Sequence, residues 1–562
     1  MEWEYEEINS NQIEEISAKC GISIEMAQIL YKRGLKDKKE ILEFINPDIS
    51  MLRDPFGFEH MKSAVELILQ KKSKGEKVYI YGDYDVDGIT AAAFMTIVLR
   101  NCGIDTGYYI PNRMQDGYGL NKKAIDYIRQ NGGKLIITVD VGVNSSEEIK
   151  YAKDNGISII VTDHHKLLQE PEEDILMINP KLSGNYGFSA LSGAGVALKL
   201  AEALYITQGI SLEKVYDYMD IVMLGTVADV VPMLDENRII IKNGLEKLKE
   251  TKIKGLNYII RYLKINKSTL DTTDVSFFIA PMLNALGRTG DSTIGVDFFM
   301  EEDEFVIYNI IEEMKKANKI RRSIERLIFN EITENLGEKL LNLDYIFLKS
   351  EKWHPGVIGV VAARLALKYN VPVFLISLNG KTGKASCRST DGINIFDMLK
   401  VISHKFIRFG GHDLAAGFVA KEEDLKFIES AIANMLPEKL KKSVEKEIEI
   451  DLKLSPINIE KKFIKEMEIL APFGISNSQP LFYTEEVKFE YIKKFGVDNR
   501  HFKAFMVKDG VTYSSVGFNL GHKIGDTCFN KKYDVVYYPE RVEHKGEEFI
   551  QLKIKDFKDK SL

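Results

Sequence analysis

Three aspartates alternate in the stretch YGDYDVDGIT, residues 81–90, and a glycine follows them at once. The carboxylates of Asp83, Asp85 and Asp87 would repel one another unless a positive charge lies between them. Hard divalent cations prefer several oxygen ligands, so this spacing predicts a metal site. The alternative is a polar turn that closes a strand, with Gly88 supplying a positive φ. The motif alone is compatible with both interpretations.

Further acidic and histidine residues occur in three later stretches. They are Asp140 in TVDVGVN, Asp163, His164 and His165 in VTDHHK, and Asp229 in GTVADVVPM. Taken singly, the first two aspartates could cap a turn or a helix, and a loop histidine is usually solvated. Asp229 lies in an apolar stretch, where an unpaired carboxylate is costly. One hypothesis, a dinuclear metal site, explains the whole set, and imidazole ligands favour Mn²⁺ over Ca²⁺.

The elements that would position these residues alternate between strands and helices from Lys77 to Met233. Strands are expected at KVYIYG (77–82), KLIITVD (134–140), ISIIVTD (157–163) and DILMINP (174–180), with helices between them. This alternation predicts an α/β fold with a doubly wound parallel sheet. Ligands bind at the carboxyl ends of the strands in such sheets, where Asp83, Asp140 and Asp163 fall.

The second half of the chain changes character twice. Apolar residues recur every three or four positions over 303–336, which predicts one helix about 45 Å long, closed by Gly337. It would join two domains, and a local coiled coil is the alternative. A second, smaller α/β region follows from Leu343 to Val419, in which FGGHDLAAG is interpreted as a loop. Alternation with a period of two from Glu445 predicts a small β-barrel of the OB-fold type.

Composition sets broad limits on function. The net charge of the 562 residues is −7, yet residues 487–562 hold 15 Lys and Arg against 11 Asp and Glu. A locally basic tail is compatible with a nucleic-acid partner. The apolar run AAAFMTIVL is too short to span a bilayer, the first residues are unlike a secretory signal, and the four cysteines form no CxxC pair. We therefore expect no membrane partner and a cytoplasmic location.

The residues DYDVDGIT, Asp140, the DHH triplet and Asp229 together resemble the DHH phosphoesterase superfamily. Along the whole chain the similarity is to the RecJ exonucleases, which degrade single-stranded DNA from the 5′ end. Other stretches that resemble this family are PNRMQDGYGL (111–120), LSGAGVALKL (191–200), PMLNALGRTGD (281–291), WHPGVIGVVAARL (353–365), SCRS (386–389), FGGH (409–412) and LAPFGISNSQP (470–480). The resemblance implies an N-terminal helical segment (1–70), a DHH catalytic domain (71–302), a linking helix (303–340), a DHH-associated domain (341–440) and an OB-fold (441–562).

The resemblance also implies roles for the site residues. Asp85 would hold one metal, Asp140 would bridge both, and Asp87, His164 and Asp229 would hold the other. Asp83 and His165 would lie close by, with His165 facing the substrate phosphate. His165, Arg288 and His412 would be catalytic. Substrate contacts would come from Arg113, Asn284, Arg288, Ser386, Arg388, Gly410, Gly411 and His412. Met282 occupies a position where many relatives carry an arginine, so that phosphate contact is in doubt.

The function implied by this resemblance is hydrolysis of single-stranded DNA from the 5′ end to mononucleotides in DNA repair and recombination. Two divalent ions are expected as cofactors, with Mn²⁺ preferred and Mg²⁺ as the alternative. Single-stranded DNA is the expected partner of a monomer, and a single-strand-binding protein and a helicase are candidate protein partners. One alternative is a DHH phosphodiesterase of short oligonucleotides or cyclic dinucleotides, which the barrel disfavours. Another is a catalytically silent DNA-binding module, which the complete ligand set disfavours.

Overall fold

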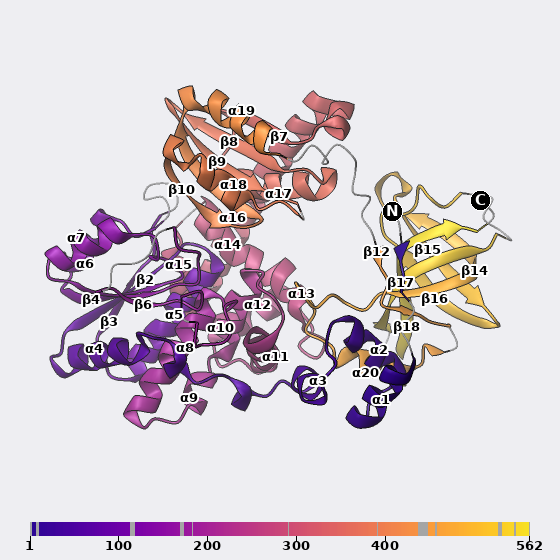
Figure 1. The fold of residues 1–562 in the computed structure, drawn as a ribbon, viewed down its shortest axis with the longest axis horizontal. Helices are drawn as coiled ribbons and strands as arrows, with labels where there is room; N and C mark the ends of the chain where they lie inside the picture. Colours follow the sequence, from indigo (N-terminus) through magenta and orange to yellow (C-terminus); the bar gives the residue numbers. More distant parts are fainter. Residues whose placement is uncertain are drawn as a thin grey trace. The chain divides into compact units, whose positions relative to one another are not determined.

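The computed structural model describes residues 3–6, 10–112, 119–168, 174–182, 184–289, 291–390, 392–436, 448–455, 458–525, 531–544 and 547–560. The chain divides into two compact units, one formed by residues 49–443 and the other by residues 1–48 together with 444–562 (Figure 1). Among the described helices, none combines the length and the apolar character that crossing a membrane requires.

A parallel sheet organises the first part of the larger unit. Its strands are β2 (Lys77–Gly82), β3 (Thr106–Tyr109), β4 (Gly133–Val139), β5 (Ser158–Thr162) and β6 (Leu176–Ile178). The order is β3-β2-β4-β5-β6, and every pairing is parallel. The doubly wound sheet predicted from the sequence is confirmed, although β3 was not foreseen. Alternate strand residues enter separate apolar clusters, so both faces of the sheet are covered.

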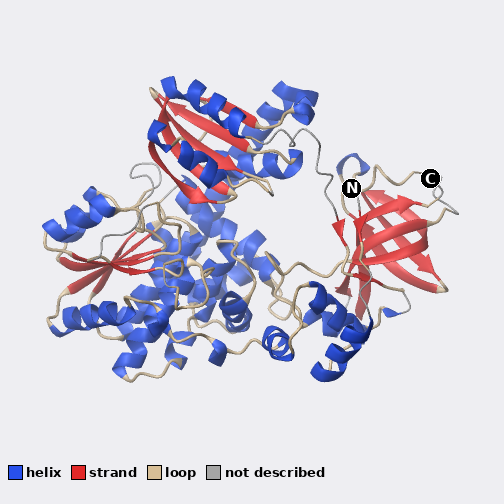
Figure 2. Ribbon diagram, viewed as in Figure 1, coloured by secondary structure: helices blue, strands red, loops and turns tan. Residues whose placement is uncertain are grey.

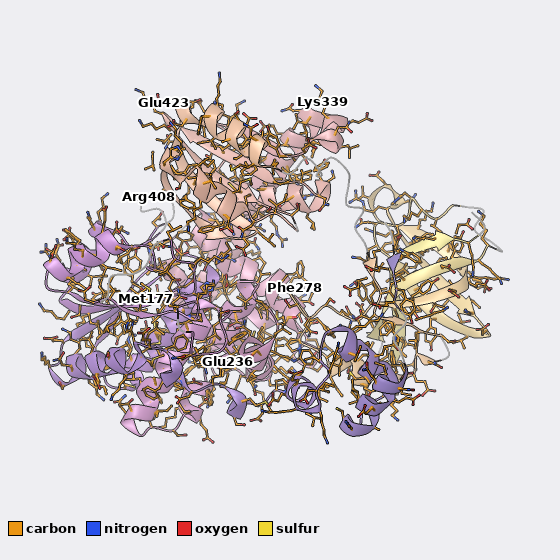
Figure 3. The ribbon with its side chains drawn as sticks, viewed as in Figure 1. Met177, Glu236, Phe278, Lys339, Arg408 and Glu423 are labelled. Carbon is orange, nitrogen blue, oxygen red and sulfur yellow. The ribbon has the colours of Figure 1, made fainter. Side chains whose placement is uncertain are left out.

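Helices cover this sheet and extend beyond it. They are α4 (Met61–Ser73), α5 (Val86–Asn101), α6 (Lys122–Gln130), α7 (Ser146–Asp154), α8 (Gly193–Gln208), α9 (Glu213–Tyr216), α10 (Met219–Ala228), α11 (Asp235–Lys249), α12 (Lys254–Tyr262), α13 (Thr272–Asp274), the π-helical turn η3 (Val275–Ile279), α14 (Ala280–Thr289) and α15 (Thr293–Met300). Glu236 lies inside this helical layer (Figure 3), where it pairs with Lys199 at 2.7 Å and accepts a hydrogen bond from Tyr186 at 2.7 Å. The buried carboxylate of Glu236 is therefore paired.

The long predicted helix is a single element, α16 (Glu304–Leu336). Asp303 caps its first turn by accepting hydrogen bonds from the N–H groups of Phe305 and Val306, and Gly337, with φ of 50°, ends it. The first half of the helix packs on the sheet-bearing core through residues such as Ile307. The second half joins a separate apolar cluster through residues such as Ile332.

A second sheet follows α16 and has mixed strand directions (Figure 2). Its strands are β7 (Ile346–Ser350), β8 (Val373–Asn379), β9 (Thr382–Arg388), β10 (Phe406–His412) and β11 (Ala415–Lys421), in the order β10-β11-β9-β8-β7. Its helices are α17 (Ile358–Tyr369), α18 (Ile395–Val401) and α19 (Leu425–Met435). The interpretation of FGGHDLAAG as a loop is wrong, because its residues form the antiparallel hairpin β10–β11. Small residues concealed the alternation that marks a strand.

The smaller unit contains a closed barrel of five strands. They are β14 (Phe482–Phe495), β15 (His501–Lys508), β16 (Val511–Gly517), β17 (Tyr533–His544) and β18 (Glu547–Asp559). The order β14-β15-β16-β18-β17 closes through a β14–β17 pairing, which confirms the predicted barrel. The short strand β13 (Leu452–Lys453) pairs in parallel with the start of β14, and α20 (Lys461–Glu468) precedes the barrel.

The first 48 residues belong to this barrel unit, whereas the sequence suggested one helical segment over 1–70. They contain β1 (Trp3–Glu4), α1 (Ser10–Cys20), α2 (Ile24–Lys32) and α3 (Lys38–Ile45). Strand β1 pairs in parallel with β12 (Ile448–Glu449), and the indole of Trp3 donates a hydrogen bond of 3.1 Å to Asp556. These partners lie more than 440 residues away in the chain, so no local pattern could indicate them.

Candidate active site

The candidate ligands lie at the carboxyl edge of the parallel sheet. Asp83 follows β2, Asp140 follows β4, and Asp163 with the two histidines follows β5. Because β2, β4 and β5 are adjacent in the sheet, their ends bring these side chains together. Asp229, at the end of α10, reaches the same place: its Oδ2 lies 3.6 Å from His164 Nε2.

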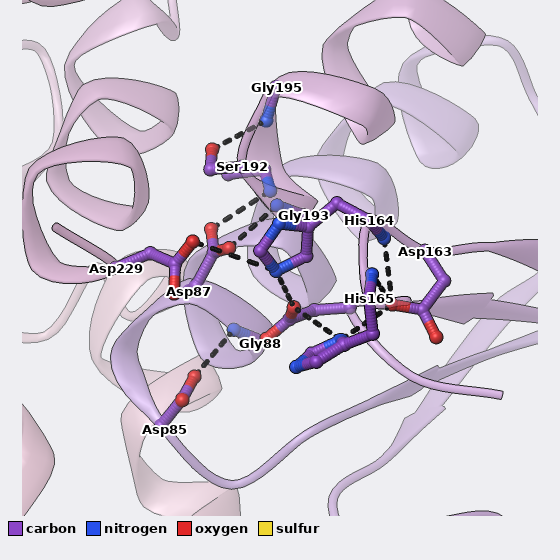
Figure 4. Close-up of polar contacts among 12 residues, drawn as sticks. Asp85, Asp87, Gly88, Asp163, His164, His165, Ser192, Gly193, Gly195 and Asp229 are labelled. Atoms are coloured by element: carbon purple, nitrogen blue, oxygen red, sulfur yellow. Dashed lines mark hydrogen bonds and ion pairs between the residues drawn. The ribbon is translucent and has the colours of Figure 1, made fainter. Parts of the chain in front are cut away.

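The turn between β2 and α5 positions the three alternating aspartates. Asp85 is the N-cap of α5, and its Oδ1 accepts a hydrogen bond of 3.1 Å from the N–H of Gly88 (Figure 4). Gly88 has no positive φ, so that interpretation is wrong. Instead, a Cβ atom at this position would lie within 2.7 Å of backbone atoms of Asp83. The glycine thus lets the helix begin directly against the residue that follows the strand.

Asp87 is held by the N-terminus of another helix. Its two carboxylate oxygens accept hydrogen bonds from the N–H groups of Gly193, at 2.6 Å, and Ala194, at 2.9 Å, in the first turn of α8 (Figure 4). A Cβ atom on Gly193 would lie 2.5 Å from Cβ of Asp140, so only glycine fits there. The stretch LSGAG therefore serves the site through its backbone amides, a role that was not foreseen from the sequence.

Three clusters of potential ligands in the described residues include Asp140, and two of them consist wholly of predicted metal ligands. Potential ligand atoms of Asp83, Asp85 and Asp140 lie within 4.8 Å of one another, and so do those of Asp87, Asp140 and His164. Asp140 Oδ1 is 3.1 Å from His164 Nε2, yet both atoms are buried and neither makes a hydrogen bond to the described residues. Asp140 also has a φ of 61°, in the left-handed region that residues other than glycine seldom adopt. Buried oxygen and nitrogen atoms in this arrangement fit two divalent cations with one bridging carboxylate.

The charges of the cluster are unfavourable without a cation. Burial, and then the nearby Asp85, raise the pKa of Asp87 to about 7. Burial and the neighbouring aspartates, Asp87 first, raise the pKa of Asp140 and of Asp229 well above the usual range. The carboxylates therefore resist simultaneous ionisation, which a bound cation would reverse.

Asp163 orients both histidines. Its Oδ1 accepts hydrogen bonds from the backbone N–H of His164 at 2.7 Å and of His165 at 3.1 Å, and from Nδ1 of His165 at 2.7 Å. Burial alone would raise the pKa of Asp163, but the charge and hydrogen bond of His165 hold it well below the usual range. Burial alone would lower the pKa of His165, but Asp163 raises it to about 9. Nε2 of His164 is thereby left to face Asp140.

His412 joins the site from the second sheet. Its ring lies 4.7 Å from the ring of His165 and 5.6 Å from that of His164, measured between centroids. Burial, and then the charge of His165, lower the pKa of His412 to about 3, so the metal-free site favours its neutral form. The hairpin positions it: Gly411, with φ of 148°, would place a Cβ atom 2.4 Å from the carbonyl oxygen of Ala415.

The candidate phosphate contacts occupy one face of the second sheet and one helix of the first domain. Across the adjacent strands β10, β11 and β9, one row of paired residues is His412, Ala415 and Arg388. A second row is Gly410, Gly417 and Ser386. The N-terminus of α17 lies against the same pair of side chains: a Cβ atom on Gly359 would be 2.8 Å from Ser386 Oγ. A hydroxyl, a guanidinium and a helix N-terminus together suit a phosphate.

The helix α14 carries Asn284 and Arg288, one turn apart. Arg288 Nη1 donates a hydrogen bond of 3.1 Å to the carbonyl oxygen of Gly356, in the loop before α17, so it connects the two domains. Met282 is buried in the apolar core and therefore supplies no phosphate contact. Arg113 lies outside the described residues.

Two lysines at the site were not predicted. Lys181, after β6, donates a hydrogen bond to the carbonyl oxygen of His164, and burial lowers its pKa. Lys166, next to the DHH triplet, forms an ion pair with Asp413, next to His412, and so links the two domains. Their positions immediately after β5 and β6, at the carboxyl edge, were the available signal in the sequence.

Comparisons with known proteins agree with this arrangement. In chain order, residues 77–226 match the DHH family N-terminal domain, residues 342–438 the DHHA1 domain, and residues 450–556 the RecJ OB domain. The chain is 33% identical to the single-stranded-DNA-specific exonuclease RecJ of Bacillus subtilis, over 93% of this chain and 66% of that protein. It is 28% identical to the Escherichia coli protein of the same name, over 88% of this chain and 89% of that one.

Solved structures show the same fold. A crystal structure of RecJ from Thermus thermophilus in complex with Mn²⁺ aligns with a TM-score of 0.84 at 24% identity, covering 99% of this chain and 79% of that one. A structure of exonuclease RecJ bound to manganese aligns with a TM-score of 0.59 at 27% identity, covering 69% and 97%. The chain spans about two thirds of the length of the Bacillus subtilis relative. With three domain matches in this order and relatives along most of its length, the chain belongs to the DHH family, in its RecJ branch.

Proposed function

We propose that this chain is a metal-dependent exonuclease that hydrolyses single-stranded DNA from its 5′ end to mononucleotides, in DNA repair and recombination. The observation that carries the proposal is the pair of ligand clusters sharing Asp140. The names of the relatives, single-stranded-DNA-specific exonucleases, and the manganese in a related RecJ structure support it. Two divalent ions are the proposed cofactors, Mn²⁺ by preference and Mg²⁺ as the alternative.

The residues of the chain divide the chemical work. Asp83, Asp85 and Asp140 would hold one cation, and Asp87, Asp140 and His164, with Asp229 beside them, would hold the other. When bound, the cations polarise the scissile phosphate and lower the pKa of the attacking water. Asp163 keeps the histidines in their orientations. His165 and His412, whose rings lie 4.7 Å apart beside the clusters, would contact the phosphate as it becomes more negative.

Groups on the second sheet account for the proposed preference for a 5′ end. Ser386, Arg388 and the N-terminus of α17 offer a site for a terminal phosphate, and Arg288 lies beside the loop that begins this helix. A phosphate held there would fix the distance from the chain end to the clusters, so one nucleotide would be released at a time. A 5′-phosphorylated end satisfies this requirement, whereas a continuous strand does not.

Finer aspects of the proposal concern partners and location. We propose a cytoplasmic monomer that acts on single-stranded DNA, with a single-strand-binding protein and a helicase as candidate partners. The barrel supports the DNA partner, since an OB-fold binds single strands through a groove and stacking side chains. The proposed boundaries at residues 302, 340 and 440 are tested by limited proteolysis.

The test uses a single-stranded DNA of about 40 nucleotides, labelled at the 5′ end in one sample and at the 3′ end in another. In Mn²⁺ we expect immediate release of the 5′ label as mononucleotide and stepwise shortening of the 3′-labelled strand, and no reaction in EDTA. Asp140→Ala should abolish both signals while the fold is retained, because both clusters lose a ligand. Intact long strands with cleaved di- or trinucleotides would refute the proposal and assign the chain to small substrates.

A further inference from the structure

Charge is segregated along the linking helix α16. Residues 315–326, KKANKIRRSIER, contain six Lys and Arg and one Glu, which gives a local net charge of +5 in a chain whose total is −7. The residues on either side are acidic, with Glu312 and Glu313 before this segment and Glu331 and Glu334 after it. A solvated helix usually alternates its charges, so a basic block between acidic ends is unusual.

Four of the basic residues form one exposed stripe. Lys316, Lys319, Arg322 and Arg326 are all exposed, and none forms an ion pair or a hydrogen bond with another described residue. At about 100° per residue, their spacing places them within an arc of roughly 120°, and at 1.5 Å per residue the stripe is about 15 Å long. The other two basic residues of the segment, Lys315 and Arg321, are paired with Glu312 and Glu325.

The position of the stripe relates it to the candidate phosphate contacts. Helix α16 packs against α14, which carries Arg288, and against α17, whose N-terminus lies beside Ser386. The contact with α17 is defined: the guanidinium of Arg364 lies 3.8 Å from the ring centroid of Phe329 and 3.4 Å from Glu325. The stripe is thus presented by the helix that supports both sides of the phosphate-binding region.

We propose that this stripe, Lys316, Lys319, Arg322 and Arg326, binds the phosphate backbone of the single strand outside the active site. The proposal rests on the proposed function, because that function supplies the polyanion. Unpaired cations at regular spacing match a chain of phosphates, and neutralising each phosphate releases a counterion. A second class of polyanion, an acidic protein, would need a matching carboxylate pattern. The packing of α16 against α14 and α17, which carry candidate phosphate contacts, favours the nucleic acid.

The test compares two variants of the full chain that lose the same charge. The stripe variant combines Lys316→Gln, Lys319→Gln, Arg322→Gln and Arg326→Gln, since glutamine is a good helix former. The control variant combines Lys74→Gln, Lys123→Gln, Lys150→Gln and Lys214→Gln, which are exposed lysines elsewhere on the larger unit. Affinity for a 5′-phosphorylated single strand of about 40 nucleotides is measured in EDTA between about 50 and 200 mM salt.

We expect the slope of log affinity against log salt to become shallower by about 2 to 3 in the stripe variant, since each phosphate contact contributes about 0.7 for single strands. The control variant should keep the wild-type slope, and Lys316→Arg with Lys319→Arg should keep it too. Cleavage of a 5′-phosphorylated trinucleotide in Mn²⁺ should be unchanged in the stripe variant.

An equal slope in the wild type and the stripe variant would overturn the inference, whether or not the stripe binds an acidic protein. An equal loss in both variants would overturn it as well, because the effect would then be one of net charge. If the wild-type chain neither binds nor degrades single-stranded DNA, the proposed function fails, and that result is distinct from a change confined to the stripe variant.

Discussion

Replacing the shared carboxylate should change the stability of the protein in opposite directions with and without metal. In Asp140→Asn the amide keeps the shape of a side chain whose Oδ1 makes no hydrogen bond to the described residues. Ligand atoms of Asp83, Asp85 and Asp87 lie within 4.8 Å of those of Asp140. At an effective dielectric constant of 20, one such pair of charges repels by about 3 kcal/mol. In EDTA at pH 8 we therefore expect Asp140→Asn to raise the free energy of unfolding by about 3 kcal/mol.

The pH dependence of this stability difference follows from the linkage between proton binding and folding. Burial and the neighbouring aspartates raise the folded-state pKa of Asp140 above its unfolded value. The wild-type carboxyl therefore contributes stability that is fully present below the unfolded pKa and is lost as pH rises through the folded pKa. Asparagine has no proton to lose. The difference between variant and wild type should hence grow as pH rises from 5.5 to 8.

Bound metal should reverse the sign of the stability difference between Asp140→Asn and the wild type. Cation binding stabilises the folded state by an amount that grows with the logarithm of the affinity, and the variant lacks the ligand that both clusters share. The assay is urea unfolding followed by circular dichroism, in EDTA and in saturating Mn²⁺, at pH 5.5 and pH 8. The control Asp154→Asn changes an exposed carboxylate on α7 and should stay within about 0.5 kcal/mol. An Asp140→Asn protein that is less stable than wild type in EDTA at pH 8, or equally stabilised by Mn²⁺, would refute the reasoning.

Three further predictions concern other parts of the chain. Arg388→Ala should reduce the preference for a 5′-phosphorylated over a 5′-hydroxyl strand by about 10- to 100-fold, because one charged hydrogen bond is lost. An unchanged preference in competition assays would exclude this contact. Burial raises the pKa of Asp220 to about 6, so the contribution of this carboxyl group to stability falls by about 3 kcal/mol as pH rises from 3.8 through 6. Asp220→Asn should therefore be about 2 kcal/mol more stable than the wild type at pH 8 in urea titrations. A stability difference between the two proteins that does not change with pH would contradict this. Removing both 1–48 and 444–562 should leave a folded 49–443 protein that cleaves trinucleotides but binds long strands weakly in filter assays, whereas equal losses on both substrates would make the barrel unit structural.

The sequence by itself determined the parts of this protein that depend on local pattern. Buried β-branched runs separated by helical stretches imply a parallel sheet, and a parallel sheet brings the carboxyl ends of its strands to one edge. That rule placed Asp83, Asp140 and Asp163 together before any contact was known. The 3.6-residue period of 303–336 likewise defined α16 to within one residue of its observed start.

Only the tertiary structure decided which groups meet across long separations. The backbone amides of Gly193 and Ala194 that hold Asp87 belong to a helix more than 100 residues away. The ring of His412 reaches His165 from another sheet. Strand β1 pairs with β12, at the far end of the chain. Such contacts depend on how whole elements pack, and packing selects backbone amides and small residues that leave no periodic signal. For that reason the clustering of the candidate ligands could be predicted from the sequence, whereas the groups that hold them in place could not.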